Sequence, residues 1–232
     1  CGGSIAVNAQ LGSSTSGAIS MDTGAGGSVN IAGPVGSASN ISVVADSITT
    51  SNTLVSDFGS ISLSNVGTSG FVTIGGGVHA RNSISVMSNT IAVNAPLQAD
   101  FGSVNLTAPS GASGSSAAIN GSVKAGSSIN VTTHSLAINA PLESGFSVTL
   151  QPRSNGTHVS VGPETPGAFS NTTTELGLID ADQLSLGSGT AGDLVANAAI
   201  GPFAFDSLVL RSGGDVTQTP GSTITVRREE GD

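Results

Sequence analysis

The sequence predicts an all-β fold, a parallel β-helix (solenoid) of about ten coils with roughly 22 residues in each coil. Three observations support this fold class. Sequence motifs, called lines below, recur every 43 to 45 residues, and each alternates apolar and polar side chains. Half of that period, about 22 residues, relates further lines to one another. Together they describe short strands that repeat along one axis.

The clearest repeat is the stretch IAVNAPLQADFGSVNL at 91–106, which returns as LAINAPLESGFSVTL at 136–150. Earlier forms are SIAVNAQL at 4–11 and SITTSNTL at 47–54. Corresponding apolar residues follow at steps of 43, 43 and 45: Ile5, Ile48, Ile91 and Leu136. Two further lines keep the steps of 43 and 45: Ile41, Ile84 and Ile129, and Phe58, Phe101 and Phe146. Because three lines share one period, the chain is a repeat protein.

Each repeated line alternates, as in SISV at 83–86, SVNL at 103–106 and SINV at 128–131. Alternation with a period of two places the aliphatic side chains on one face of a strand and serine or asparagine on the other. Glycine and β-branched residues disfavour helix throughout, so helix content should be close to nil. Short strands with one apolar face must stack on neighbours to bury it.

The stacking unit follows from the half-period. Ile84 precedes Val104 by 20 residues and Val104 precedes Ile129 by 25, so each long repeat contains two coils. Coils of this size suit a parallel β-helix with an aliphatic interior and a surface of serine, threonine and asparagine. A propeller blade has a similar period, but tight Asn-Gly turns between long strands are missing. The β-helix is therefore preferred.

Corners are predicted where asparagine and proline interrupt the strands. Asn94 and Asn139 should end strands, adopt the left-handed region and hydrogen-bond along the stack. Pro96 and Pro141 lack an N–H and belong at corners. Two leucines then re-enter the core: Leu97 and Leu142. Three phenylalanines repeat in phase and are predicted to stack in the core: Phe58, Phe101 and Phe146.

The repeats divide the chain into three parts. Residues 1–161 form a β-helix with 43–45-residue double-coil repeats, and residues 162–183 form an irregular, loop-rich stretch. Residues 184–232 continue the β-helix with single-coil repeats of 22–24 residues. In this last part Leu184 returns as Leu208 after 24 residues, and Asp193 as Asp215 after 22.

Composition disfavours several classes of function. The net charge is −9, and the six basic residues are scattered apart from one Arg-Arg pair, which disfavours nucleic-acid binding. No apolar run of about 18 residues could span a membrane. The single cysteine, Cys1, forms no intrachain disulfide, and lipidation, a cloning scar and an arbitrary cut point all remain open for it.

No catalytic, cofactor-binding or metal-binding residues are predicted, and the chain is not expected to be an enzyme. Asp180 and Asp182 form a D-x-D pair that is interpreted as a solvated turn before the strand at Leu184. Asp193 and Asp215 are one coil apart and could stack, with Ca²⁺ between them as the less favoured alternative. The three histidines lack metal-binding spacing: His79, His134 and His158. His79 lies 45 residues before Lys124, so its column should face solvent.

Glycosylation is left open at six N-x-S/T sequons, since a chain rich in these residues forms such triplets by chance. The sequons begin at Asn40, Asn105, Asn120, Asn130, Asn155 and Asn171.

The lines SINVTTHSLAINAPL (128–142), LGLIDADQLSLGSGTAGDLVANAAI (176–200) and LVLRSGGDVTQTPGSTITV (208–226) resemble the shafts of filamentous-haemagglutinin-like, two-partner-secreted bacterial exoproteins. The resemblance covers essentially the whole chain. It implies a right-handed β-helix, an outer-membrane secretion partner, and attachment to host or neighbouring cell surfaces or competition with other cells. No amino-terminal secretion signature or carboxyl-terminal toxin domain is identified, so the chain is interpreted as an internal piece.

The predicted function is therefore a structural shaft segment of a secreted or cell-surface adhesin that spaces or presents binding regions. Two alternatives remain: a polysaccharide-binding or polysaccharide-cleaving β-helix of the lyase or tailspike type, and a fibre-forming subunit. A groove with clustered carboxylates or aromatics would favour the first alternative. Unpaired strand edges at both ends favour end-to-end self-association, which the charged tail Arg227–Asp232 would oppose.

Overall fold

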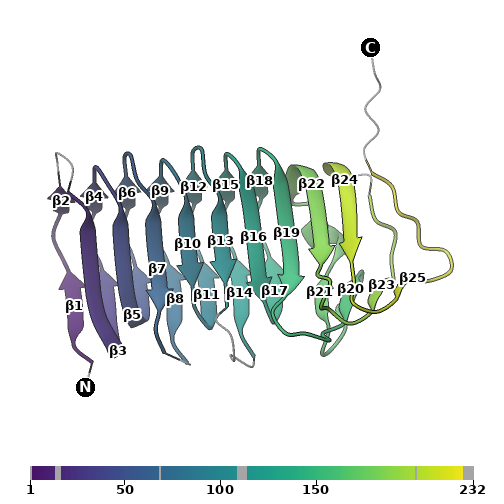
Figure 1. Ribbon diagram of the computed structural model, residues 1–232. Helices are drawn as coiled ribbons and strands as arrows, with labels where there is room; N and C mark the ends of the chain where they lie inside the picture. Colours follow the sequence, from purple (N-terminus) through teal and green to yellow (C-terminus); the bar gives the residue numbers. More distant parts are fainter. Residues whose placement is uncertain (1, 14–16, 68, 109–113, 202, 227–232) are drawn as a thin grey trace, which may run out of the picture.

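The protein folds as a right-handed parallel β-solenoid of about nine turns with about 22 residues per turn, which confirms the predicted fold class (Figure 1). The computed structural model describes residues 2–13, 17–67, 69–108, 114–201 and 203–226. Within them, one sheet contains 21 strands and a second contains four. Every strand pairing given for the two sheets is parallel, because each strand meets its equivalent in the next coil.

Each regular coil contributes one short strand to each of three faces. The first face contains β2 (Leu11–Ser13), β4 (Val35–Ser37), β6 (Leu54–Ser56), β9 (Val78–Ala80), β12 (Leu97–Ala99), β15 (Val123–Ala125) and β18 (Leu142–Ser144). The second contains β7 (Ile61–Asn65), β10 (Ile84–Met87), β13 (Val104–Thr107), β16 (Ser128–Thr133) and β19 (Ser147–Pro152). The third contains β1 (Ser4–Val7), β8 (Phe71–Ile74), β11 (Thr90–Val93), β14 (Ser116–Ile119) and β17 (Ser135–Ile138). Two longer strands run through the second and third faces, β3 (Ile19–Ile31) and β5 (Ile41–Thr50).

The register confirms the half-period. Ile84 pairs with Val104, and Val104 pairs with Ile129, so the three side chains occupy successive coils of one column. All three are 0% exposed. The alternation is also confirmed in β16, where Ile129 and Val131 are buried while the residues between them are partly exposed. Stacked aliphatic columns of this kind make up the solenoid interior.

The predicted hydrogen bonding of the asparagine corner is confirmed, but its predicted left-handed backbone conformation is wrong. Asn120 Nδ2 donates to Asn94 Oδ1 at 2.9 Å, and Asn139 Nδ2 donates to Asn120 Oδ1 at 2.8 Å, so three amides form a ladder along the axis. No described residue other than glycine has a positive φ, so these asparagines do not adopt the left-handed region. Pro96 and Pro141 lie between strands as predicted. The ladder explains the repeated Asn, because each amide satisfies the next.

The carboxyl-terminal part changes the cross-section of the solenoid. Two long strands, β22 (Ile179–Gly187) and β24 (Ala204–Arg211), extend the large sheet. The second sheet has the order β21 (Phe169–Asn171), β20 (Val159–Val161), β23 (Leu194–Ala196) and β25 (Val216–Gln218). Residues 162–183, predicted as irregular, contain β21, the four-residue helix α1 (Thr173–Leu176) and the start of β22.

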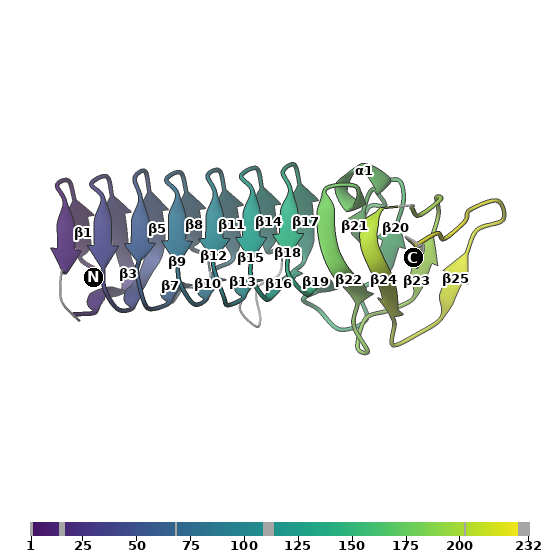
Figure 2. The same ribbon diagram turned by 90° about the horizontal axis from the view of Figure 1, so that it is seen from above.

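Glu175 of α1 covers the place where the third face stops. Among the described strands β17 pairs only with β14. Glu175 Oε1 accepts the backbone N–H of Ile138 in β17 at 2.9 Å, while Oε2 accepts the N–H of Thr172 at 2.8 Å. Thr172 also caps the helix, completing a capping box with Glu175. A single carboxylate thus satisfies part of a strand edge and joins the start of α1 to β17. Figure 2 shows α1 beside β21.

Candidate functional site

Three phenylalanines predicted to lie in the core are instead exposed at one corner of the solenoid. Phe58, Phe101 and Phe146 are 67%, 67% and 65% exposed, so the core prediction is wrong. They lie in the turns that join the first face to the second, the row of turns at the top of Figure 1. We call these three residues the aromatic corner.

Close contact between coils explains why the rings point outward. A Cβ added at Gly102 would lie 2.4 Å from Ser83 Oγ and 2.5 Å from the Asn82 carbonyl oxygen. Backbones that approach this closely leave no interior space beside the turn for a ring. Phe101 precedes Val104 by three residues, an odd offset that places it opposite the buried side of the strand. Phe146 precedes buried Val148 by two, so the offset alone does not identify its exposure.

Arg81 occupies the coil between the first two rings. Its guanidinium carbon lies 5.6 Å from the centroid of Phe58 and 5.1 Å from that of Phe101, within cation–π range of both. The corner of the coil before Phe146 instead contains Ser127, whose carbonyl oxygen accepts the N–H of Phe146 at 2.9 Å. In the following coil, Gln183 lies within β22 (Ile179–Gly187) and donates its backbone N–H to the Phe146 carbonyl at 3.0 Å.

Shallow hollows lie on both sides of the Phe146 turn. One, of about 460 Å³, is lined by Ser127, Ser128, Phe146, Ser147, Asp182 and Gln183. The other, of about 290 Å³, is lined by Lys124, Ala125, Gly126, Glu143, Ser144, Gly145 and Asp180. Asp180 and Asp182 therefore do not form a turn before a strand: both lie within β22, exposed, and each lines a different hollow.

A polar column runs beside the aromatic corner on the first face. Its outward residues pair in register from His79 to Gln98, Lys124, Glu143 and Asp180. This confirms that the columns of His79 and Lys124 coincide and face solvent. Lys124 Nζ lies 2.9 Å from Glu143 Oε2, and this hydrogen bond raises the pKa of Lys124 above 10.5.

The Asp100 side chain contacts His79 and Gln98 of the same column. The His79 ring, 3.0 Å from both Asp100 oxygens, and the Gln98 amide, 2.9 Å from Oδ1, hold the pKa of Asp100 below its ordinary value of 3.8. A carboxyl whose pKa is lowered on folding stabilises the fold above that ordinary value, and the contribution disappears as the pH falls through the lowered pKa. The Asp100 side chain is partly exposed, so solvent screening keeps this contribution small.

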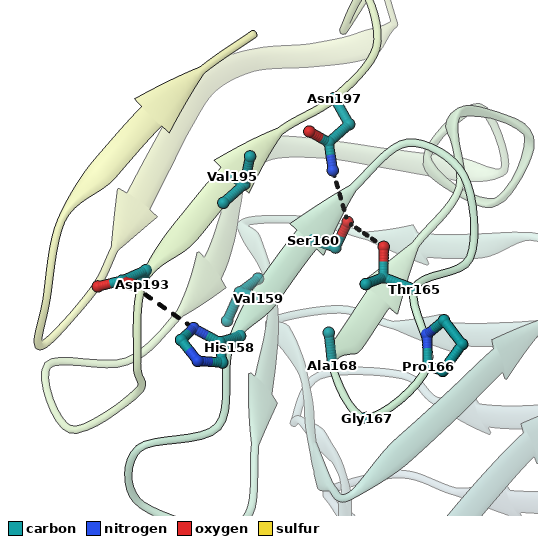
Figure 3. A pocket seen from close by; sticks show the side chains of 10 residues that line it. All are labelled: His158, Val159, Ser160, Thr165, Pro166, Gly167, Ala168, Asp193, Val195 and Asn197. Carbon is teal, nitrogen blue, oxygen red and sulfur yellow. Dashed lines mark hydrogen bonds and ion pairs between the residues drawn. The ribbon is translucent and has the colours of Figure 1, made fainter.

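A third hollow, of about 340 Å³, lies on the second sheet beneath the loop at 162–168 (Figure 3). His158 and Asp193 meet at one end, with Nδ1 3.8 Å from Oδ2. At the other end Ser160 Oγ lies 3.1 Å from Thr165 Oγ1 and accepts from Asn197 Nδ2 at 3.3 Å. Ser160 is buried and its partners are a hydroxyl and an amide, so this arrangement does not activate it as a nucleophile.

Of the remaining candidate residues, the structure brings together Asp193 and Asp215. Asp193 and Asp215 stack in adjacent coils, as the spacing allowed, but Asp193 Oδ1 accepts the N–H of Asp215 at 3.0 Å. His134 lies between β16 and β17, in a different part of the chain from the other two histidines. Across the described ranges, no three His, Cys, Asp or Glu side chains form a group that could hold a metal ion. Cys1 lies outside the described residues.

The sequons occupy different environments. Asn171 is 0% exposed, so a glycan cannot be attached there while the fold is intact. Asn130 Nδ2 donates to Asn105 Oδ1 at 2.9 Å, which uses both amides in a ladder. Asn155 is exposed in a turn that continues into Gly156 with a φ of 72°.

Comparison with known proteins gives no identification. No family model matches the sequence, no curated protein matches it, and no solved structure matches the fold. Within the part of the chain that the structure describes, no helix is long and apolar enough to cross a membrane. The fold defines the class, a β-solenoid repeat protein.

Proposed function

We propose that this chain is a structural shaft segment of a secreted or cell-surface bacterial adhesin, which spaces or presents binding regions. The observation that carries the proposal is the continuity of the stacked columns. The column through Ile84, Val104 and Ile129 extends in register from Ile19 to Leu208. A rod with an uninterrupted core transmits position and force along its axis, as a spacer requires.

The sequence resemblance to filamentous-haemagglutinin-like shafts supports this proposal and adds an outer-membrane secretion partner. Contacts with host or neighbouring cell surfaces follow from the same resemblance. End-to-end contact with more β-helix, including a second copy, fits the edges of a solenoid. Among the described strands β1 pairs only with β3. The tail Arg227–Asp232, expected to oppose such contact, lies outside the described residues.

Surface labelling of the source bacterium tests this function. Antibodies against the folded chain should label intact cells or the culture medium, because a shaft segment acts outside the cell. Deleting the gene for the outer-membrane secretion partner should abolish this label and leave the protein inside. Labelling that requires permeabilised cells in the parent strain would contradict the proposal.

A further inference from the structure

Phe146 stands at a turn whose composition is not explained by folding. Phe146 is 65% exposed, whereas a phenylalanine side chain stabilises a fold mainly when it is buried. The equivalent turn in the coil before it contains Gly126 and Ser127, so the solenoid forms this corner without a ring. Phe146 lines one hollow, and a second hollow lies on the other side of its turn, both with polar linings.

The hollow beside Phe146 combines an aromatic ring with hydrogen-bonding groups. Asp182 contributes a carboxylate and Gln183 an amide, both exposed on the following coil. Hydroxyls of three serines complete the lining: Ser127, Ser128 and Ser147. A ring face beside acceptors and donors matches a pyranose, which presents C–H groups on one face and hydroxyls around its rim.

The aromatic corner also has an axial spacing. Phe101 N–H donates to Arg81 O, Ser127 N–H to Gly102 O, and Phe146 N–H to Ser127 O, so Phe101 and Phe146 lie two coils apart. Two coils correspond to about 9.6 Å at ~4.8 Å per strand. That distance is close to the length of two sugar rings in an extended chain. A glycan lying parallel to the rod axis would therefore meet a ring at every second sugar.

A second protein copy fits this surface less well. Stable protein interfaces bury about 800 Å² on each partner, whereas three separate phenylalanines that each bury at most about 150–250 Å² do not form one apolar patch. Like charges also oppose such a contact, because the net charge is −9 and exposed acids lie on both sides of the Phe146 turn: Glu143, Asp180 and Asp182. The same acids disfavour anionic polysaccharides.

We propose that the aromatic corner is a binding track for a neutral polysaccharide, with its main site at Phe146, Asp182 and Gln183. The sugar stacks on the Phe146 ring, and its hydroxyls hydrogen-bond to the Asp182 carboxylate and the Gln183 amide. The chain continues along the axis toward Phe101. This binding role is independent of the shaft function, since a rod can space other modules with or without it.

The test is affinity electrophoresis and calorimetry of the purified chain with neutral glucan, mannan and galactan, and with alginate as the acidic counterpart. We expect at least one neutral glycan to bind and alginate not to bind. Phe146→Ser should raise Kd about tenfold, the size expected for loss of one aromatic contact. Asp182→Ala should weaken the binding of the same glycan. Phe71→Ser is the matched control, because Phe71 is 42% exposed on a different face, in β8.

Circular dichroism and thermal melting should show that every variant keeps the wild-type fold. If Phe146→Ser fails to fold, Asp182→Ala still tests the proposed site. Three results would overturn the proposal. The first is no binding of any neutral glycan, and the second is binding that Phe146→Ser and Phe71→Ser change equally. The third is concentration-dependent self-association that disappears in Phe146→Ser without glycan binding, which would assign the corner to a second copy.

Discussion

Val104→Asp should unfold the solenoid or lower its stability by more than about 4 kcal/mol, because it places a carboxylate in an aliphatic column without a partner. Val104 is 0% exposed and lies between Ile84 and Ile129 of the adjacent coils. The column consists of aliphatic side chains, so no polar side chain within it can offset the desolvation of the charge. Urea unfolding followed by circular dichroism measures the loss.

The adjacent residue gives the matched control. Ser103 is partly exposed at the corner before β13, so Ser103→Asp should change stability by no more than about 0.5 kcal/mol. Equal losses for the two variants would mean that the inward and outward sides of β13 have been assigned wrongly.

Glu175→Ala should be the second most damaging change, with a loss of about 3 kcal/mol, because hydrogen bonds to a charged group contribute more than neutral ones. The buried carboxylate accepts the N–H of Ile138 at 2.9 Å, and the N–H and hydroxyl of Thr172 at 2.8 and 3.0 Å. Its removal leaves the Ile138 amide unpaired at the end of the third face. Amide hydrogen exchange at Ile138 should therefore accelerate along with the fall in stability.

Two variants define this effect. Glu175→Gln keeps one acceptor oxygen and should give a smaller loss than Glu175→Ala. Glu164→Ala removes an exposed carboxylate from the loop before β21 and should be nearly neutral. If Glu175→Ala is as stable as Glu164→Ala, the carboxylate does not hold the end of the third face.

The repeating part of the fold could be predicted because its physics is local and periodic. Alternation identifies the buried side of each strand, and the half-period identifies its partner in the next coil. Both predictions, the buried side and the partner in the next coil, are correct for Ile84, Val104 and Ile129. The asparagine ladder follows from the same spacing, since equivalent side chains in adjacent coils lie within hydrogen-bonding distance.

The candidate site was less accessible to sequence reasoning. Repetition in phase shows that Phe58, Phe101 and Phe146 are equivalent, but it does not show whether equivalent residues point inward or outward. Strand alternation stops at a corner, where the contact between adjacent backbones decides the direction. The odd offset from Phe58 to Ile61 and from Phe101 to Val104 was the available signal.

The carboxyl-terminal part departs from the repeat, and its contacts are not periodic. The capping pair Thr172 and Glu175 has a recognisable i, i+3 spacing. The bond from Glu175 to Ile138 spans 37 residues and has no counterpart in another coil. The hollow over the second sheet likewise depends on how the loop at 162–168 lies against β20 and β23. Such contacts can be found only from the folded chain.

If equivalent two-coil units stack in register as a rigid rod, removing one unit should shorten the rod by two coils and leave the rest of the fold intact. Spin labels at Ser20 and Thr149, with Cys1 replaced by serine, lie six coils apart in one column. Their separation should be about 29 Å at ~4.8 Å per coil, with a narrow distribution. Deleting residues 61–103 removes 43 residues and joins Ser60 to Val104 at identical Asp-Phe-Gly-Ser corners, 57–60 and 100–103.

Double electron–electron resonance on this deletion variant should give a separation of about 19 Å, two coils shorter, with cooperative unfolding retained. Deleting residues 61–92 removes 32 residues, which is not a whole number of coils, and should destroy the register. A broad distance distribution in the parent chain, or a 43-residue deletion that unfolds like the 32-residue one, would show that the two-coil units do not stack in register as a rigid rod.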